Sequence, residues 1–261
     1  MLTFQKLAQP QSLAEAYEIL TAQKNNFLLG GGAFLRLGSA KRGTAVDLSA
    51  CELNYIEANE EEVRLGAMAS LRDLETSLSM RQLGCGVASQ AVSHIIGVQF
   101  RHSVTVGGSV FGRFGFSDLL PALLVLEASV HLYKGGIVPL AQFMEQPPQK
   151  DILTQVVIPK GACRASYQQM RTSCSDFPLL NMAAAETDGV WKIAVGARPG
   201  RAALAIQAAA ALDAGVAPEE AARLAAAELS FAGNNRASEA YRRQLCEALT
   251  VRAVKEVLAC K

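Results

Sequence analysis

Two glycine-rich segments, far apart in the sequence, hold the residues best suited to bind an anion. Gly30–Gly32 follows the apolar run Phe27–Leu29, and the second segment reads Thr-Val-Gly-Gly-Ser over Thr105–Ser109. Adjacent glycines let backbone N–H groups approach a ligand without a Cβ in the way, and clusters of such donors bind phosphates. Two segments of this kind predict a ligand that carries a diphosphate.

An acidic residue and an apolar run follow the second segment. Asp118 could cap a helix that begins at Leu119, or its carboxylate could accept hydrogen bonds from sugar-like hydroxyls. Gly30–Gly32 is not a Walker A loop, because no Gly-Lys-Ser/Thr follows it. It does not fit the Rossmann fingerprint, because the third glycine of that pattern would fall at Leu35. A plain tight turn is the alternative interpretation of Gly30–Gly32.

Composition predicts a globular protein without a strongly charged partner. The chain has 261 residues, half of them hydrophobic, and a net charge of +1. It can therefore bury a sizeable core in one large or two modest domains, and nucleic acid and anionic membrane are weak candidates as partners. We read no signal peptide at the N-terminus, and the most apolar stretch, Leu119–Leu126, is too short to span a bilayer. We expect a cytoplasmic protein.

The six cysteines and three histidines show no metal-binding pattern. No two cysteines fall within four residues of each other, which argues against a zinc ribbon or a cysteine-ligated iron–sulfur cluster. We expect free, mostly buried thiols and no metal in this chain.

Short strands and small helices are expected to position the glycine segments. Phe27–Leu29 is predicted as a strand, and residues 33–37 as a helical turn closed by Gly38. Ile152–Ile158, which ends at Pro159, is predicted as an edge or terminal strand. Further elements before residue 160 are helices at Ser12–Leu20, Ser70–Leu78, Leu83–Ile96 and Leu119–Leu126, and strands at Ala45–Leu48, Leu53–Ile56, Val63–Ala67 and Val130–Tyr133.

The pattern changes near residue 160, where we place a domain boundary. Three strands with a hairpin turn at Asp188-Gly189 come first, and alanine-rich helices follow them. Strands followed by helices indicate an α+β unit. The predicted strands are Cys163–Arg171, Leu180–Glu186 and Val190–Val195, and the predicted helices are Ala202–Leu212, Pro218–Glu228 and Ser238–Ala259.

Nearly the whole chain resembles the FAD-binding subunit of the molybdenum hydroxylases, the flavoprotein family of xanthine dehydrogenase and carbon monoxide dehydrogenase. The family's Ala-Gly-Gly-Thr-Asp-Leu is similar to Gly30–Leu35, and a strand ending in Ile-Gly-Ala is similar to Leu65–Ala67. Its Arg-Asn-x-x-Thr-Ile/Val-Gly-Gly-Asn/Ser is similar to Arg101–Ser109. Its Asp-Leu-x-Pro-Ala-Leu-Leu-Ala-Leu-Asp-Ala is similar to Asp118–Ala128.

The resemblance implies an α+β fold with two parts. A two-part FAD-binding domain of the vanillyl-alcohol-oxidase type would comprise subdomains at residues 1–58 and 59–160. A C-terminal α+β domain with an antiparallel sheet and helices would cover residues 161–261.

The resemblance also implies an FAD site. The two glycine segments would hold the diphosphate, Asp118 would bind the ribityl hydroxyls, and Leu153 would lie near the flavin or its adenosine part. Phe177 would cover the isoalloxazine, and Gln168 stands where relatives often have a lysine. The predicted cofactor-binding residues are Leu29, Gly30, Gly31, Gly32, Ala33, Phe34, Leu35, Arg101, His102, Thr105, Gly107, Gly108, Ser109, Asp118, Leu153, Gln168 and Phe177.

Each single residue also has a structural interpretation, and the sequence departs from the family pattern in places. Phe177 could be a core residue and His102 a surface histidine. Ala33 and Phe34 replace the Thr and Asp of the first signature. Three aromatic residues stand where smaller or more polar ones are usual, namely Phe111, Phe114 and Phe116.

The function implied is electron transfer within a heterotrimer like xanthine dehydrogenase. Electrons from a molybdopterin subunit would pass through a [2Fe-2S] subunit to FAD in this chain, and then to NAD, oxygen, a quinone or a carrier protein. No catalytic acid or base is predicted. The alternatives are a degenerate scaffold subunit that binds no flavin and a stand-alone flavin oxidoreductase.

Overall fold

The computed structural model describes residues 2–35, 38–39 and 41–260. Its first part is a three-stranded parallel sheet of order β1-β3-β2, with one helix packed against β3. Ser12, where that helix was predicted to begin, caps it by accepting the backbone N–H of Glu15. The elements are β1 (Thr3–Ala8), α1 (Leu13–Ala22), β2 (Phe27–Leu29) and β3 (Lys41–Asp47).

The second part is built on a five-stranded antiparallel sheet of order β4-β5-β8-β6-β7. Of the predicted alternatives, an edge or a terminal strand, the edge strand was wrong, because β8 lies between β5 and β6; β8 is the last strand of this sheet in the sequence. Pro159 is tolerated there because it is the last residue of the strand, opposite Glu62. The strands are β4 (Ile56–Ala58), β5 (Glu62–Gly66), β6 (Ser129–Leu132), β7 (Gly136–Pro139) and β8 (Leu153–Pro159).

Short helices connect β5 to β6. Ser70 and Asp73 form a capping box at the start of the first of them. The single helix predicted over residues 83–96 is wrong, because Gly84, Cys85 and Gly86 all have positive φ and the helix begins only at Val87. The segments are α2 (Leu71–Thr76), α3 (Leu78–Gln82), the 3₁₀ turn η2 (Leu83–Gly86), α4 (Val87–Ser93), α5 (Val98–Ser103), α6 (Val106–Gly112), α7 (Leu119–Val125) and, after β7, α8 (Leu140–Glu145).

The third part is a four-stranded antiparallel sheet of order β12-β11-β10-β9 with three helices. Asp188 and Gly189 both have positive φ and form the predicted hairpin turn. The helix expected from Ala202 begins only at Ile206, because Ala203 and Leu204 pair with β11 instead. The elements are β9 (Cys163–Met170), β10 (Leu180–Thr187), β11 (Val190–Gly196), β12 (Ala203–Leu204), α9 (Ile206–Asp213), α10 (Pro218–Glu228) and α11 (Glu239–Ala259).

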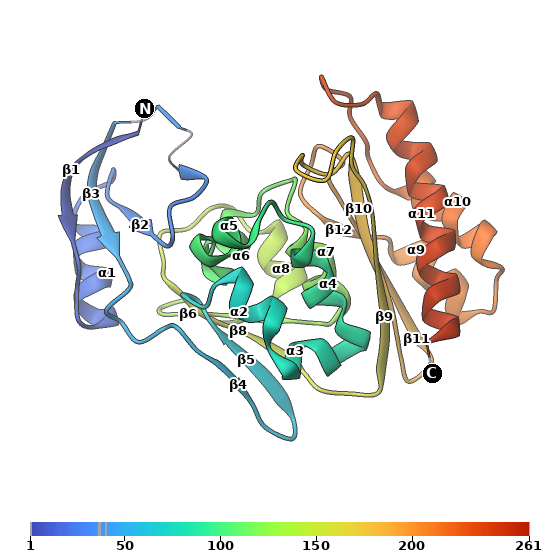
Figure 1. The fold of residues 1–261 in the computed structure, drawn as a ribbon, viewed down its shortest axis with the longest axis horizontal. Coiled ribbons are helices and arrows are strands. Elements are labelled where there is room, and N and C mark those ends of the chain that lie inside the picture. Colours follow the sequence, from blue (N-terminus) through green and yellow to red (C-terminus); the bar gives the residue numbers. More distant parts are fainter. Residues whose placement is uncertain (1, 36–37, 40, 261) are drawn as a thin grey trace.

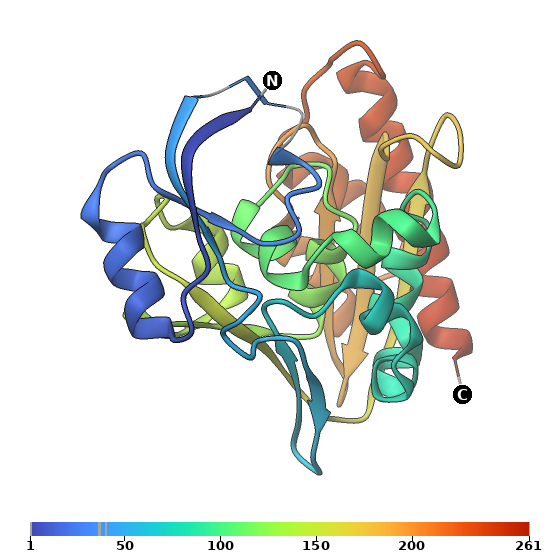
Figure 2. The same cartoon turned by 60° about the vertical axis from the view of Figure 1, so that its left-hand side comes forward.

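This C-terminal sheet lies between two hydrophobic cores, and each of its faces packs against one of them. Figures 1 and 2 show the middle helices on one side of it and α9–α11 on the other. Along β10, Ala183 and Ala185 belong to the first core, whereas Met182 and Ala184 belong to the second. The strict alternation places side chains of successive residues on opposite faces. Both faces of β10 are therefore buried.

The prediction of six free thiols was wrong for two of them. A disulfide joins Cys85 in η2 to Cys260 after α11. The two residues are 175 positions apart, so no local spacing could reveal the pair. Among the described residues no helix is both long and apolar enough to cross a membrane.

Candidate cofactor site

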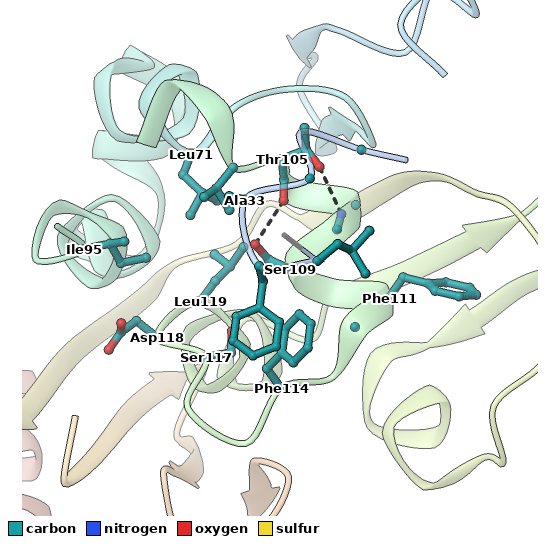
Figure 3. Close-up of a pocket in the computed structure, with 18 of the residues that line it drawn as sticks. Ala33, Leu71, Ile95, Thr105, Ser109, Phe111, Phe114, Ser117, Asp118 and Leu119 are labelled. Carbon is teal, nitrogen blue, oxygen red and sulfur yellow. Dashed lines mark hydrogen bonds between the residues drawn. The ribbon is translucent and has the colours of Figure 1, made fainter. Parts of the chain in front are cut away.

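A cavity of about 590 Å³ lies where the first glycine loop, the middle helices and the β9–β10 loop meet (Figure 3). Its lining is mostly apolar, with Thr105, Ser109, Asp118 and Arg171 among its polar members. Most of the predicted cofactor-binding residues line this one cavity. They are Gly30, Gly32, Ala33, Phe34, Leu35, Thr105, Gly107, Gly108, Ser109, Asp118, Leu153 and Phe177.

The two glycine segments pack directly against each other beside this cavity. A Cβ on Gly31 would lie 1.8 Å from the carbonyl oxygen of Ser103, and a Cβ on Gly30 would lie 3.0 Å from Thr105 Oγ1. Gly31 also has a φ of +59°, which glycine adopts without strain. Close approach of two backbones therefore explains the first glycine cluster.

The second segment forms the first turn of α6 and not a free loop. Thr105 is the N-cap, and its Oγ1 accepts the N–H of Gly108 at 3.1 Å. The N–H of Gly107 donates to Ala67 O at 2.8 Å, and that of Ser109 donates to Thr105 O at 3.0 Å. The backbone N–H groups expected to hold an anion are thus already used within the protein, whereas the hydroxyl hydrogen of Thr105 has no acceptor among the described residues.

Free backbone donors lie in the first loop instead. The N–H groups of Ala33 and Phe34, which line the cavity, donate to no acceptor among the described residues. The helical turn predicted here is described only at residues 33–35; Arg36 and Leu37 lie outside the described residues.

Asp118 lies across the pocket from Thr105 in Figure 3. It stands at the N-cap position of α7 but its side chain makes no capping bond. Its buried carboxylate is contacted by three residues of the C-terminal part. Tyr167 Oη donates to Oδ1 at 2.5 Å, Asn181 Nδ2 donates to it at 3.1 Å, and Arg171 Nη2 lies 2.7 Å away. Burial, followed by the charge of Asp118, raises the pKa of Tyr167, so this hydroxyl stays a donor.

Most of the aromatic residues that depart from the family pattern gather in one cluster at the cavity, whereas Phe111 packs against Phe143 instead. The ring centroids of Phe34 and Phe114 are 4.4 Å apart, and those of Phe34 and Phe116 are 5.0 Å apart. Phe116 also contacts Phe177 of the β9–β10 loop at 4.4 Å. Rings from all three parts of the chain therefore meet at this cavity, at centroid distances close to those of favourable aromatic pairs.

Five predicted residues do not line the cavity, namely Leu29, Gly31, Arg101, His102 and Gln168. Arg101 is buried and bonds both carboxylate oxygens of Glu75, at 2.8 and 3.1 Å. His102 is exposed. Gln168 lies in β9 and donates to Ser166 Oγ at 3.4 Å. The predicted binding roles of these residues stay predictions.

Tyr167 and Asn181 are site residues that the sequence did not indicate. Tyr167 belongs to the buried face of β9, and Asn181 is the second residue of the buried strand β10. Both lie far from the glycine segments in sequence. The strand pairing Asn181↔Gln169 places β9 beside β10 and brings the two side chains to the same carboxylate.

Residues 2–161 match the family model described as the FAD-binding domain in molybdopterin dehydrogenase. The chain belongs to this family. Residues 165–257 match the C-terminal domain of the CO dehydrogenase flavoprotein. The protein thus belongs to the FAD-binding subunits of the molybdenum hydroxylase family, which are parts of oxidoreductases, and the predicted fold class is confirmed.

Both sequence relatives and solved structures match this flavoprotein subunit at low sequence identity. The Escherichia coli (strain K12) protein named "Uncharacterized protein YgfM" is 22% identical over 183 residues, which cover 69% of each chain. A chain of the carbon monoxide dehydrogenase from Hydrogenophaga pseudoflava superposes with a TM-score of 0.88 at 23% identity, covering 97% of both chains. A chain of the quinoline 2-oxidoreductase from Pseudomonas putida 86 gives 0.85 at 24% identity, covering 98% of this chain and 97% of that one.

Proposed function

We propose that this cavity is the FAD site, and that the subunit passes electrons from a [2Fe-2S] partner subunit to an acceptor such as NAD, as in xanthine dehydrogenase. The observation that carries the proposal is the convergence of both glycine segments, Asp118 and Leu153 on one cavity. The sequence alone predicts each of these residues as a cofactor contact.

The chemistry of the lining fits the three parts of FAD. A diphosphate needs hydrogen-bond donors, and the N–H groups of Ala33 and Phe34 and the hydroxyl of Thr105 are available. Ribityl hydroxyls need an acceptor, and Asp118 supplies a carboxylate. A planar ring system suits the apolar and aromatic walls. No cation on the protein is required for the diphosphate.

Bound FAD can take electrons singly and release them as a pair. The chain's own residues then have to bind the cofactor, orient it and keep water from its rings, and no acid or base on the protein is needed. The [2Fe-2S] cluster and the molybdopterin would reside on two partner subunits of a cytoplasmic heterotrimer. The subdomains at 1–58 and 59–160 and the C-terminal domain at 161–261 remain our proposed division of the chain.

The test is a titration of the purified full-length chain with FAD, followed by flavin absorbance and by equilibrium dialysis. We expect stoichiometric binding, a yellow protein, and release of FAD on denaturation. Thr105→Val should weaken binding because the hydroxyl donor is lost, whereas Thr44→Val should not, because Thr44 lies outside the cavity lining. A colourless protein that takes up no FAD would refute the proposal.

The alternative is a scaffold subunit without flavin. The aromatic cluster formed by Phe34, Phe114, Phe116 and Phe177 favours it, because the rings contact each other across one side of the cavity. The same titration separates the two functions. Recovery of the chain from its native source with an iron–sulfur protein and a large molybdenum protein would support either subunit role over a stand-alone flavin oxidoreductase.

A further inference from the structure

Asp118 needs partners because its carboxylate is buried. The residue is 5% exposed, and a buried carboxylate without donors or a countercharge is strongly unfavourable. All three side chains that contact it reach the same oxygen, Oδ1. They are Tyr167 and Asn181, which donate hydrogen bonds, and Arg171, which supplies the countercharge.

The second carboxylate oxygen is left for a ligand. Oδ2 of Asp118 receives no hydrogen bond from any residue that the structure describes, although each carboxylate oxygen can accept two. Asp118 lines the cavity. A ligand group that donates a hydrogen bond, such as a hydroxyl of a polyol chain, would therefore complete its bonding.

The three contacts differ in what they can do. Tyr167 Oη has the shortest hydrogen bond to Oδ1, 2.5 Å, from a ring fixed in the buried face of β9. Arg171 Nη2 lies 2.7 Å from Oδ1 but not in hydrogen-bond geometry, so this arginine acts mainly through its charge. Asn181 also donates to Ser117 O at 3.0 Å, which fixes the backbone just before Asp118.

We infer that Tyr167, Arg171 and Asn181 are positioning residues that hold Asp118 by Oδ1 and present Oδ2 to hydroxyl donors of the ligand. The C-terminal domain thereby completes a site to which the first two parts of the chain contribute Asp118 itself and the hydroxyl of Thr105. The inference rests on the proposed binding of FAD, whose ribityl chain would supply the hydroxyls.

The test compares FAD with an FAD analogue in which hydrogen atoms replace the ribityl hydroxyls. Tyr167→Phe in the full chain keeps the ring and removes one donor to Oδ1. We expect its Kd for FAD to rise about tenfold, the effect of losing one hydrogen bond to a charged group. The Kd for the analogue should stay within about twofold, because the analogue has no hydroxyl for Oδ2. A purely structural role would weaken both ligands equally.

Tyr55→Phe is the matched control, because Tyr55 Oη also donates to a side chain, Gln155 at 2.8 Å, outside the cavity lining. It should change neither Kd. If Tyr167→Phe does not fold, Arg171→Lys takes its place, since it keeps the charge and shortens the reach. Equal losses for FAD and the analogue, or no loss for FAD, would overturn the inference. A wild-type chain that binds neither flavin would overturn the proposed function first, and the inference with it.

Discussion

Gly31→Ala should separate the two glycine segments and abolish most FAD affinity. The new Cβ would lie 1.8 Å from Ser103 O, whereas real Cβ atoms essentially never come closer than 3.0 Å. The carbonyl oxygen of Ser103 belongs to the backbone and cannot rotate away, so the two segments of the chain must move apart by more than an ångström. That shift carries the N–H groups of Ala33 and Phe34 away from the hydroxyl of Thr105. Losing two hydrogen bonds to a charged diphosphate costs about 3 kcal/mol or more, which is roughly a 100-fold rise in Kd.

The strain of a positive φ must be separated from this clash. Gly189 has a φ of +83° in the β10–β11 turn, and a Cβ there would meet nothing within 4 Å. Gly189→Ala therefore carries the same backbone strain, about 1–2 kcal/mol, without the collision. We expect it to lower the melting temperature as Gly31→Ala does, and to leave the Kd for FAD unchanged. Isothermal titration measures the Kd for FAD, and thermal unfolding measures the melting temperature. A Gly31→Ala protein with wild-type affinity would refute the packing argument.

Three further changes test other parts of the structure. Phe177→Ala should cost less than about 1 kcal/mol of stability, because the residue is 37% exposed, yet should increase the quenching of flavin fluorescence by iodide. Glu75→Gln should destabilise the chain by about 3 kcal/mol at neutral pH, since it leaves Arg101 unpaired. Burial raises the pKa of Glu75, but its hydrogen bonds from Arg101 and a second arginine outweigh this and lower it below 4.5. This stabilisation is therefore present above pH 4.5 and is lost as the pH falls through the lower folded-state pKa, so wild type and variant should converge in acid unfolding curves. The denatured, unreduced chain should show four titratable thiols, and Cys85→Ser should raise that count by one by releasing Cys260.

Much of the fold follows from local signals in the sequence. Ser12 and Ser70 begin helices where their capping residues predict them. Pro218 starts α10 and Asp188-Gly189 turns the hairpin, because each residue type has a strong backbone preference. The errors arise where tertiary packing decides. Positive φ at three successive residues from Gly84 ends any helix there. No propensity scale predicts a positive φ for the cysteine among them, Cys85.

The candidate site was also predictable only in part, because local signals mark some of its residues and tertiary packing brings in the others. Glycine segments and Asp118 are visible because their residue types are unusual at their positions. Tyr167 and Asn181 are ordinary members of buried strands, and only strand pairing in the C-terminal sheet brings them to Asp118. The cluster around Phe116 likewise required knowledge that Phe177 lies across the cavity.

The two glycine clusters look alike in the sequence but serve different ends. Gly107 is required because a Cβ there would lie 2.7 Å from both Ala67 O and Ala67 Cβ, so α6 can pack against the end of β5 only without a side chain. Its N–H is consumed in that packing. In the proposed FAD site, recognition of the diphosphate would therefore fall to the side-chain hydroxyl of Thr105 and to the backbone of the first loop. Backbone donors are independent of the side chain, which explains how Ala33 and Phe34 can replace Thr and Asp without removing an N–H group from the cavity.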